Sequence, residues 1–241
     1  MEKINGRISI ITVCYNCKDD LRKTIESIKA QTYQEIEYIV VDGASTDGTK
    51  EILKEYSEDI DVCISEPDKG IYDAMNKGIK KSSSEWLLFM NAGDIFYNNY
   101  VLENVFNFNI PASSDFIYGN YDIVFGNGKR ERRVTDRSKG IVHHQSSIYK
   151  RCLHEEYGYY IVTHPYIISD LLFFLSVPED KYKKINLPIA IIQGDGVSSG
   201  TWSRKQAQCA RYIYGIIPFS DVIKDRLRMY MGIMLRKLHL R

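Results

Sequence analysis

The stretch Ile36-Glu-Tyr-Ile-Val-Val-Asp-Gly-Ala-Ser-Thr-Asp-Gly-Thr49 decides the fold class. Its first six residues are mainly apolar and β-branched or aromatic, which predicts a strand, and a polar loop that contains glycine follows at once. A helix is predicted directly after the loop, over residues 49–56. A strand that runs through a polar loop into a helix is typical of an open parallel sheet.

The same unit recurs on both sides of this stretch. Ile8-Ser-Ile-Ile-Thr-Val13 is a short apolar run typical of a strand buried on both faces, and a helix that Asp19 or Asp20 can cap follows it. Strands separated by helices of roughly ten residues indicate βαβ units, so we expect an α/β fold with a mostly parallel sheet and flanking helices. The other elements predicted here are strands over residues 60–65 and 85–90 and a helix over 71–80.

The regular alternation of predicted strands and helices ends after residue 94. The basic run Lys129–Arg133 is interpreted as a solvated edge or loop rather than a nucleic-acid patch. Because no internal repeat or long linker separates the halves, we expect one domain over residues 1–201, divided into 1–98 and 99–201, and then a helical segment over 202–241. The elements predicted here are strands over 116–125, 145–149 and 189–193, a hairpin-type turn over 126–128, a helix over 169–175 and mostly helical structure over 202–240.

Composition and charge agree with a packed domain. The 241 residues are 44% hydrophobic and 12% aromatic, which suits one large domain with a small appendage. The formal net charge is +1, so nucleic-acid binding is not indicated. We expect a cytoplasmic protein, because the five cysteines are sparse, no signal peptide is recognised, and no stretch approaches the ~20 apolar residues of a membrane span. The Cys14-x-x-Cys17 spacing leaves a redox pair as an alternative.

Polar residues follow each strand of the first half where it ends. The loops begin with Cys14-Tyr-Asn-Cys17, Asp42-Gly-Ala-Ser45, Glu66-Pro-Asp-Lys69 and Asn91-Ala-Gly-Asp94. Because ligands bind at the carboxyl ends of parallel strands, we expect these groups to share one site. A carboxylate there can accept hydrogen bonds from a base or ribose, or hold a divalent cation on a diphosphate. No P-loop and no G-x-G-x-x-G is present, which argues against an NTPase or an ordinary dinucleotide enzyme.

Three ordered motifs, Ser9–Asn16, Val40–Thr49 and Ser65–Gly78, closely resemble the inverting glycosyltransferase family 2 with its GT-A fold. The resemblance implies an enzyme that moves a sugar from a nucleotide-sugar, and a UDP-sugar is the expected donor. The implied acceptor is a hydroxyl of a growing glycan, including a lipid-linked one, in the biosynthesis of a cell-surface polysaccharide.

The resemblance also implies roles for residues at the strand ends. Asp42 would accept a hydrogen bond from a base N–H, Tyr15 would lie beside the base, and Gly93 would let the backbone approach the ribose. Asp94 takes the place of the last acid in the family's D-x-D motif, so it would bind Mn²⁺ or Mg²⁺ shared with the donor phosphates. The other implied nucleotide-sugar contacts are Ser45, Asp68, Lys69 and Asn91.

A weaker resemblance to bacterial members that build capsule, O-antigen or exopolysaccharide units continues in the second half. Ser169-Asp170 resembles the family's E-D or S-D pair, so Asp170 would be the general base that takes a proton from the acceptor hydroxyl. His143 and His144, which precede Gln145, would contact the acceptor or the donor diphosphate. Asp195, in Gly194–Ser198, would belong to an active-site loop over the donor, although the glycines there equally fit a simple turn.

Each of these roles has a structural alternative. Asp42 can be an Asx-turn residue, and Tyr15 can be a core tyrosine. Asp94 can belong to a plain turn, and Asp170 can be a helix N-cap. Two other functions also stay open, namely a sugar nucleotidyltransferase and a non-catalytic module that binds nucleotide-sugars.

The end of the chain is basic and amphipathic. From Asp221 onward six basic residues face two acidic ones, and apolar residues from Ile223 to Leu238 recur every three or four positions. A helix of this kind can lie on an anionic membrane surface, pack on the domain or pair two subunits. We favour peripheral association of residues 221–241 with the inner face of the plasma membrane.

Overall fold

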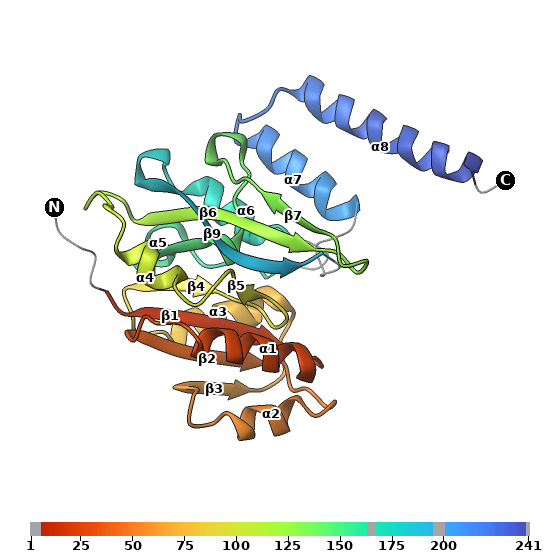
Figure 1. The fold of residues 1–241 in the computed structure, drawn as a ribbon. Helices are drawn as coiled ribbons and strands as arrows, with labels where there is room; N and C mark the ends of the chain where they lie inside the picture. The colour runs from red at the N-terminus through yellow and green to blue at the C-terminus, as the bar shows by residue number, and fades with distance from the viewer. Residues whose placement is uncertain (1–5, 163–166, 195–200, 240–241) are drawn as a thin grey trace.

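The computed structural model describes residues 6–162, 167–194 and 201–239, and this part is built on one nine-stranded sheet (Figure 1). The strand order is β3-β2-β1-β4-β8-β6-β9-β5, and β7 pairs with β6. The strands are β1 (Ile8–Cys14), β2 (Ile36–Asp42), β3 (Val62–Ser65), β4 (Trp86–Phe89), β5 (Ile95–Phe96), β6 (Phe116–Val124), β7 (Arg130–Arg133), β8 (Ser147–Lys150) and β9 (Tyr182–Gln193). The helices are α1 (Lys18–Lys29), α2 (Thr49–Glu55), α3 (Ile71–Lys81), α4 (Val101–Phe106), α5 (Cys152–Tyr157), α6 (Ser169–Ser176), α7 (Thr201–Ile213) and α8 (Phe219–His239), with short 3-10 turns η1 (Arg137–Lys139), η2 (His144–Ser146) and η3 (Glu179–Lys181).

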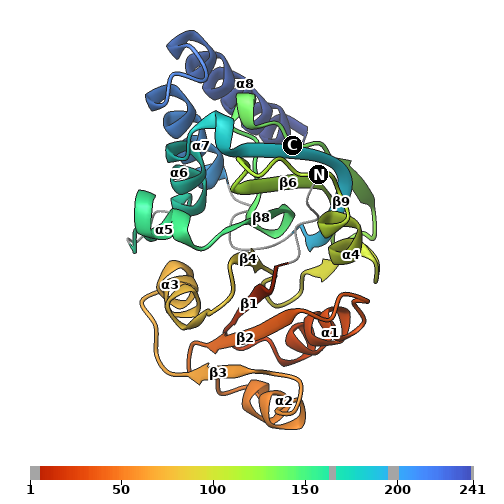
Figure 2. The same ribbon diagram turned by 90° about the vertical axis from the view of Figure 1, so that its left-hand side faces the viewer.

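The first four strands in the order form the parallel half of the sheet, as the sequence predicts. β1 pairs in parallel with β2 and β4, and β2 pairs in parallel with β3. Figure 2 shows α1 and α3 on opposite sides of these strands. Ile8 and Ile10 pack with α1 on one face, whereas Ile11 and Val13 pack with α3 on the other. Burial on both faces explains why these strands are almost continuously apolar.

Beyond β4 the sheet is mixed. β8 is antiparallel to β4 and β6, whereas β9 is parallel to β6 and antiparallel to β5. The pairing of β6 with β9 shifts register around Gly119, where a Cβ would lie 2.5 Å from the carbonyl oxygen of Leu187. Only glycine permits so close an approach, and such an irregularity bends the paired strands.

Several local expectations are corrected by the structure. Neither Asp19 nor Asp20 caps α1, because Cys17 occupies the N-cap and makes no capping hydrogen bond with its side chain. Both aspartates lie in the first turn instead, where a negative charge is favourable to the helix dipole. The strand expected over 145–149 starts at Ser147, because residues 144–146 form η2. The short elements β5, α4 and α5 had no clear sequence pattern and were not predicted.

The basic run after the hairpin turn forms β7 at the edge of the sheet. Arg130 Nε donates to Asp122 Oδ2 over 2.6 Å, and Arg132 forms an ion pair with the same carboxylate. Both guanidinium groups also lie over the ring of Tyr97. These arginines therefore have partners within the sheet, and the basic run forms an edge strand, as one of the two predicted alternatives.

The C-terminal helices α7 and α8 pack outside the sheet (Figure 1). Ala210 of α7 packs against Leu171 and Leu175 of α6, and Arg204 of α7 forms an ion pair with Asp225 of α8. Within the described residues no helix is both long and apolar enough to cross a membrane. Large apolar side chains nevertheless remain exposed along α8, namely Phe219, Ile223, Leu227, Tyr230, Met231 and Met234.

Candidate active site

A cavity of about 840 Å³ opens at the carboxyl ends of β1 and β4. The loops after these strands and the loop before α3 form one wall, which we call the donor wall. A second wall comes from η2, α6 and α7. The donor wall carries Tyr15, Asp68, Lys69, Asn91 and Asp94, and the second wall carries His143, His144, Gln145, Asp170, Arg204 and Arg211.

Tyr15 and Asp68 meet at the entrance of the donor wall. A Cβ on Gly43 would lie 2.6 Å from Asp68 Oδ2 and 3.3 Å from Tyr15 Cδ2, so the absence of a side chain at Gly43 lets the two loops approach. Tyr15 is 64% exposed, which makes its ring available to a ligand and argues against a core tyrosine. Lys69 lies beside them on the same wall.

Asp42 and Ser45 lie behind this wall and do not line the cavity. Asp42 is fully buried, and its carboxylate accepts hydrogen bonds from the backbone N–H of Ser45 over 3.1 Å and from the hydroxyl of Ser65 over 2.6 Å. Ser45 Oγ in turn accepts from the backbone N–H of Asn16 over 2.7 Å. This arrangement is the Asx-turn alternative for Asp42, and it fixes the loop that carries Tyr15.

Cys14 and Cys17 are free thiols on the cavity wall. Cys14 is the last residue of β1 and Cys17 is the N-cap of α1, and no disulfide joins them. The redox alternative gains no support from this arrangement.

The loop Asn91–Asp94 is held from several sides. Gly93 has a φ of +98°, a left-handed conformation that favours glycine, and its N–H donates to Thr24 Oγ1 over 3.0 Å. Asp94 is buried and accepts hydrogen bonds from Gln145 Nε2 over 2.6 Å and from the backbone N–H of Gln193 over 3.2 Å. Burial raises the pKa of Asp94 to about 6.

Two oxygen atoms next to Asp94 are buried without a hydrogen-bond partner, namely Asn91 Oδ1 and Gln145 Oε1. Buried polar atoms of this kind call for a ligand, and carboxylate and amide oxygens are ligands that Mg²⁺ and Mn²⁺ accept. Within residues 6–162, 167–194 and 201–239, no group of three or more His, Cys, Asp or Glu side chains is arranged to hold a metal. Asp94 and Asn91 are therefore compatible with a divalent cation, provided that a bound substrate completes its coordination.

Asp170 is the centre of a hydrogen-bonded network on the second wall. Tyr72 Oη donates to Asp170 Oδ1 over 2.7 Å, and His144 Nδ1 lies 2.7 Å from Asp170 Oδ2. His144 Nε2 lies 2.9 Å from Asn91 Nδ2. An amide N–H can only donate, so with this orientation of Asn91 the ring proton of His144 sits on Nδ1 and points to Asp170.

This network keeps Asp170 ionised. Burial by itself would raise the pKa of Asp170, but the hydrogen bonds from His144 and Tyr72 lower it to about 2. The N-cap of α6 is Ile168, and no capping bond with a side chain occurs there. The carboxylate of Asp170 is therefore directed to His144 and Tyr72 rather than used as a helix cap.

The remaining predicted residues differ in what the structure shows. His143 lies against His144 with a ring-centroid distance of 5.2 Å, and burial lowers the pKa of His143 to about 4, so it is neutral. Asp195 lies outside the described residues. Sequence reasoning missed Tyr72 and Arg211; Tyr72 lies inside the quoted motif Ser65–Gly78, whereas no local pattern marks Arg211.

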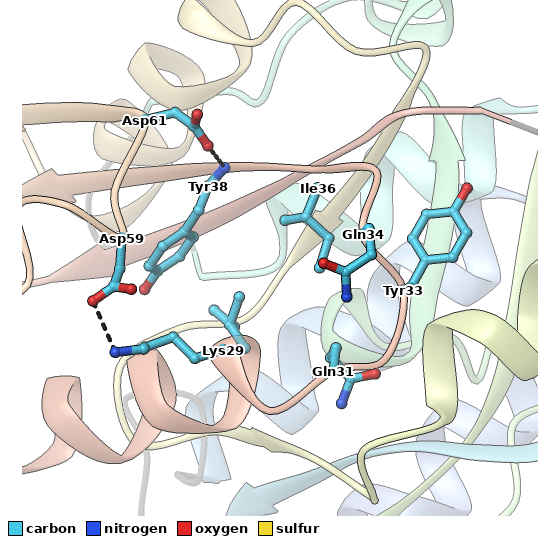
Figure 3. Close-up of a pocket in the computed structure, with 9 residues that line it drawn as sticks. Lys29, Gln31, Tyr33, Gln34, Ile36, Tyr38, Asp59 and Asp61 are labelled. Atoms are coloured by element: carbon cyan, nitrogen blue, oxygen red, sulfur yellow. Dashed lines mark hydrogen bonds and ion pairs between the residues drawn. The ribbon is translucent and has the colours of Figure 1, made fainter.

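A smaller hollow of about 190 Å³ lies near the amino end of β2 (Figure 3). Its charged groups already have partners, because Lys29 Nζ lies 2.9 Å from Asp59 Oδ2 and Asp61 Oδ2 accepts from the backbone N–H of Tyr38 over 2.7 Å. It therefore offers no convergent set of unpaired groups, and the large cavity is the candidate active site.

The chain is similar to known glycosyltransferases over part of its length. The chain is 33% identical over 117 residues to the UDP-Glc:alpha-D-GlcNAc-diphosphoundecaprenol beta-1,3-glucosyltransferase WfaP of Escherichia coli, which covers 48% of this chain and 46% of that protein. The chain spans less than half the length of the curated relatives it matches.

Solved structures show the same fold at low sequence identity. S. aureus TarS 1–349 in complex with UDP-GlcNAc has a TM-score of 0.70 at 20% identity, over 87% of this chain and 66% of that chain. The mannosyltransferase PcManGT from Pyrobaculum calidifontis, in complex with GDP-Man and Mn²⁺, has a TM-score of 0.68 at 18% identity, over 88% of this chain and 64% of that chain. These similarities confirm the GT-A fold. The model of the family described as Glycosyl transferase family 2 matches residues 9–169, which is more than half of the sequence, and the chain therefore belongs to glycosyl transferase family 2.

Proposed function

We propose that this protein transfers a sugar from a UDP-sugar to a hydroxyl of a growing glycan, with inversion at the anomeric carbon. One observation carries the proposal. A single cavity joins an exposed aromatic ring and a lysine on the donor wall to an ionised carboxylate, Asp170, on the second wall. This is the arrangement that a direct displacement needs, because donor and base must face one reacting centre.

The donor wall suits a nucleotide diphosphate. Tyr15 offers an exposed ring on which a base can stack, and Lys69 offers a charge for the phosphates. Asp42 and Ser45 act in this proposal by fixing the Tyr15 loop. The UDP-Glc donor of the WfaP relative and the UDP-GlcNAc complex of TarS support uracil as the base.

Asp94 and Asn91 would hold a divalent cation, Mn²⁺ or Mg²⁺, on the donor diphosphate. Such a cation supplies charge stabilisation to the departing UDP. The Mn²⁺ in the PcManGT complex supports this choice. The Asp94 carboxylate must be ionised for this role, and its raised pKa of about 6 leaves it ionised at neutral pH.

Asp170 would act as the general base. It takes the proton of the acceptor hydroxyl while the acceptor oxygen bonds to the anomeric carbon, and the bond from that carbon to the diphosphate oxygen breaks. His144 and Tyr72 each donate to a different oxygen of Asp170, so the carboxylate is held in one orientation and keeps lone pairs for the proton. A single displacement of this kind inverts the configuration.

The acceptor would be a lipid-linked glycan in the biosynthesis of a cell-surface polysaccharide. The acceptor of the WfaP relative, a sugar on diphosphoundecaprenol, supports this class. The exposed apolar side chains of α8, with Lys224, Arg226 and Arg228 exposed near them, suit the surface of an anionic membrane. The proposed location is therefore the cytoplasm, at the inner face of the plasma membrane.

The first experiment is release of UDP from a panel of UDP-sugars, with and without Mn²⁺. We expect turnover of at least one donor that depends on Mn²⁺ and is lost in Asp170→Asn. Release of diphosphate from UTP and a sugar 1-phosphate would instead identify a sugar nucleotidyltransferase. Binding of a UDP-sugar without any turnover, with or without glycan acceptors, would identify a non-catalytic module.

A second experiment tests the membrane association. The full chain should sediment with anionic vesicles at low salt and be released as salt rises, because the basic residues contribute through screened charges. A double variant, Leu227→Glu with Met231→Glu, changes two side chains that are 58% and 56% exposed, so it should stay folded and lose sedimentation. Equal sedimentation of both proteins would count against the α8 surface.

A further inference from the structure

The cavity contains two arginines that the proposed mechanism does not use. Arg204 and Arg211 both come from α7, seven residues apart, which is about two helical turns and places them on one side of the helix. Both line the second wall. Both arginines belong to the helical segment predicted over residues 202–241, outside the predicted catalytic domain.

Arg211 is held in place by the loop that ends η1. Its Nε donates to the carbonyl oxygen of Gly140 over 3.2 Å. Gly140 has a φ of +61°, and a Cβ there would lie 3.0 Å from Arg211 Cγ, so glycine leaves the room that the arginine occupies. Within the described residues, the two terminal nitrogens of this guanidinium have no hydrogen-bond partner, so they remain free for a ligand in the cavity.

The two arginines lie close to one carboxylate, Asp225, which already forms an ion pair with Arg204. The other carboxylate of the second wall, Asp170, is engaged by His144 and Tyr72. Burial lowers the pKa of Arg211, and the charge of Arg204 lowers it further. Two guanidinium groups that share one carboxylate at a cavity wall favour an anion, and a phosphate is the anion that the planar fork of arginine binds best.

The cavity surface near these arginines is apolar. Ala207 lies between them on α7, and α6 contributes Leu171. A sugar without an attached hydrocarbon would find few hydrogen-bonding partners there. The other apolar residues that line this part are Ile141, Val142, Val162, Ile167 and Ile168.

We propose that Arg211, assisted by Arg204, binds the phosphate of an acceptor whose sugar is joined through phosphate to an isoprenoid-type hydrocarbon, and that the apolar residues contact the first part of that hydrocarbon. This inference rests on the proposed function, because it assigns the second wall of the same cavity to the acceptor. The same phosphate chemistry occurs in the donor, so a test has to separate acceptor phosphate from donor diphosphate.

The test measures binding of geranyl diphosphate, geraniol and inorganic diphosphate to the full chain by calorimetry, with saturating UDP and Mn²⁺ present. We expect geranyl diphosphate to bind in the presence of UDP, and to bind at least tenfold more tightly than either geraniol or inorganic diphosphate. Arg211→Met should lower the affinity for geranyl diphosphate at least tenfold and leave the affinity for UDP unchanged. Arg204→Met, at a more exposed position, should weaken it severalfold.

Arg7→Met, at an exposed position at the amino end of β1 and away from the cavity, is the matched control and should change the affinity for neither ligand. Competition between UDP and geranyl diphosphate would assign the arginines to the donor and overturn the inference. The same holds if Arg211→Met lowers the affinity for UDP as much as the affinity for geranyl diphosphate. Unchanged binding of geranyl diphosphate in both cavity variants would overturn it as well. These binding results do not depend on turnover, so failure of UDP release in the wild type would reject the proposed function separately.

Discussion

Replacement of Asp170 by asparagine tests the proposed base and its network together. In the folded protein His144 and Tyr72 outweigh the effect of burial and lower the pKa of Asp170 from 3.8 to about 2. A difference of about 1.8 in pKa corresponds to roughly 2 kcal/mol of stability at neutral pH. The side chain of asparagine has one oxygen that can accept from either His144 or Tyr72, and its NH₂ group faces the other donor. We therefore expect the free energy of unfolding to fall by about that amount.

The effect on turnover should be larger than the effect on stability. Loss of a general base typically lowers the rate by about 10²–10⁴-fold. Donor affinity should be retained, because Asp170 is on the second wall and the proposed UDP contacts are on the donor wall. Urea denaturation, UDP calorimetry and UDP release measure the three quantities on the same preparation.

The pH dependence gives an independent check on the size of the stability change. Because the pKa of Asp170 is lower in the folded state than in the unfolded state, its stabilising contribution is present above about pH 4 and is lost as the pH falls through about 2. The stability difference between wild type and Asp170→Asn should therefore be smaller at pH 3 than at pH 7. Asp180→Asn, an exposed aspartate outside the cavity, is the control and should show neither effect. Full turnover in Asp170→Asn, or loss of UDP binding along with turnover, would refute the assignment.

Three further predictions concern the donor wall and the network. Tyr15→Ala should weaken UDP by about 5- to 100-fold, since stacking of a base on an aromatic ring contributes about 1–3 kcal/mol, whereas Tyr15→Phe should bind normally in calorimetry. Asp94→Asn should abolish the effect of Mn²⁺ on UDP affinity, and treatment of the wild type with EDTA should have the same result. In the wild type, the effect of Mn²⁺ on UDP affinity should increase as the pH rises through about 6, where Asp94 ionises. Tyr72→Phe should lower stability by about 1 kcal/mol in urea denaturation through loss of its hydrogen bond to Asp170, and unchanged stability would show that this bond contributes nothing.

The parallel half of the fold could be predicted because its signals are local. β1, β2 and β4 are buried on both faces, so apolar runs such as Ile8–Val13 stand out from the sequence, and the polar loops that end the strands must meet at one edge. Tyr15, Asp68 and Asp94 were placed on the cavity in this way, and the structure brings them there. The same reasoning could not foresee the position of Asp42. Its burial depends on Ser45 in the following loop and on Ser65 at the end of β3, which both donate hydrogen bonds to the carboxylate.

The second half could be predicted only in part, because its pairings are set by contacts distant in sequence. β9 runs parallel to β6 and antiparallel to β5, and no periodicity in the chain distinguishes these pairings. Arg211 illustrates the difficulty for the site. It reaches the cavity because α7 packs on α6 through Ala210, and because Gly140 leaves room for its side chain. Neither contact has a local signature.

The network around Asp170 follows from one strand register. β8 is antiparallel to β4, with Leu88 opposite Ile148. Three residues beyond Leu88 the chain reaches Asn91, and four residues before Ile148 it reaches His144, so an antiparallel register brings these two positions together. The 2.9 Å contact between Asn91 Nδ2 and His144 Nε2 is the result. A parallel pairing of β8 would carry residue 144 to the opposite edge of the sheet, away from the donor wall. The antiparallel entry of β8 is therefore what joins the loops of the first half to Asp170, and it explains why the complete site requires both halves in one sheet.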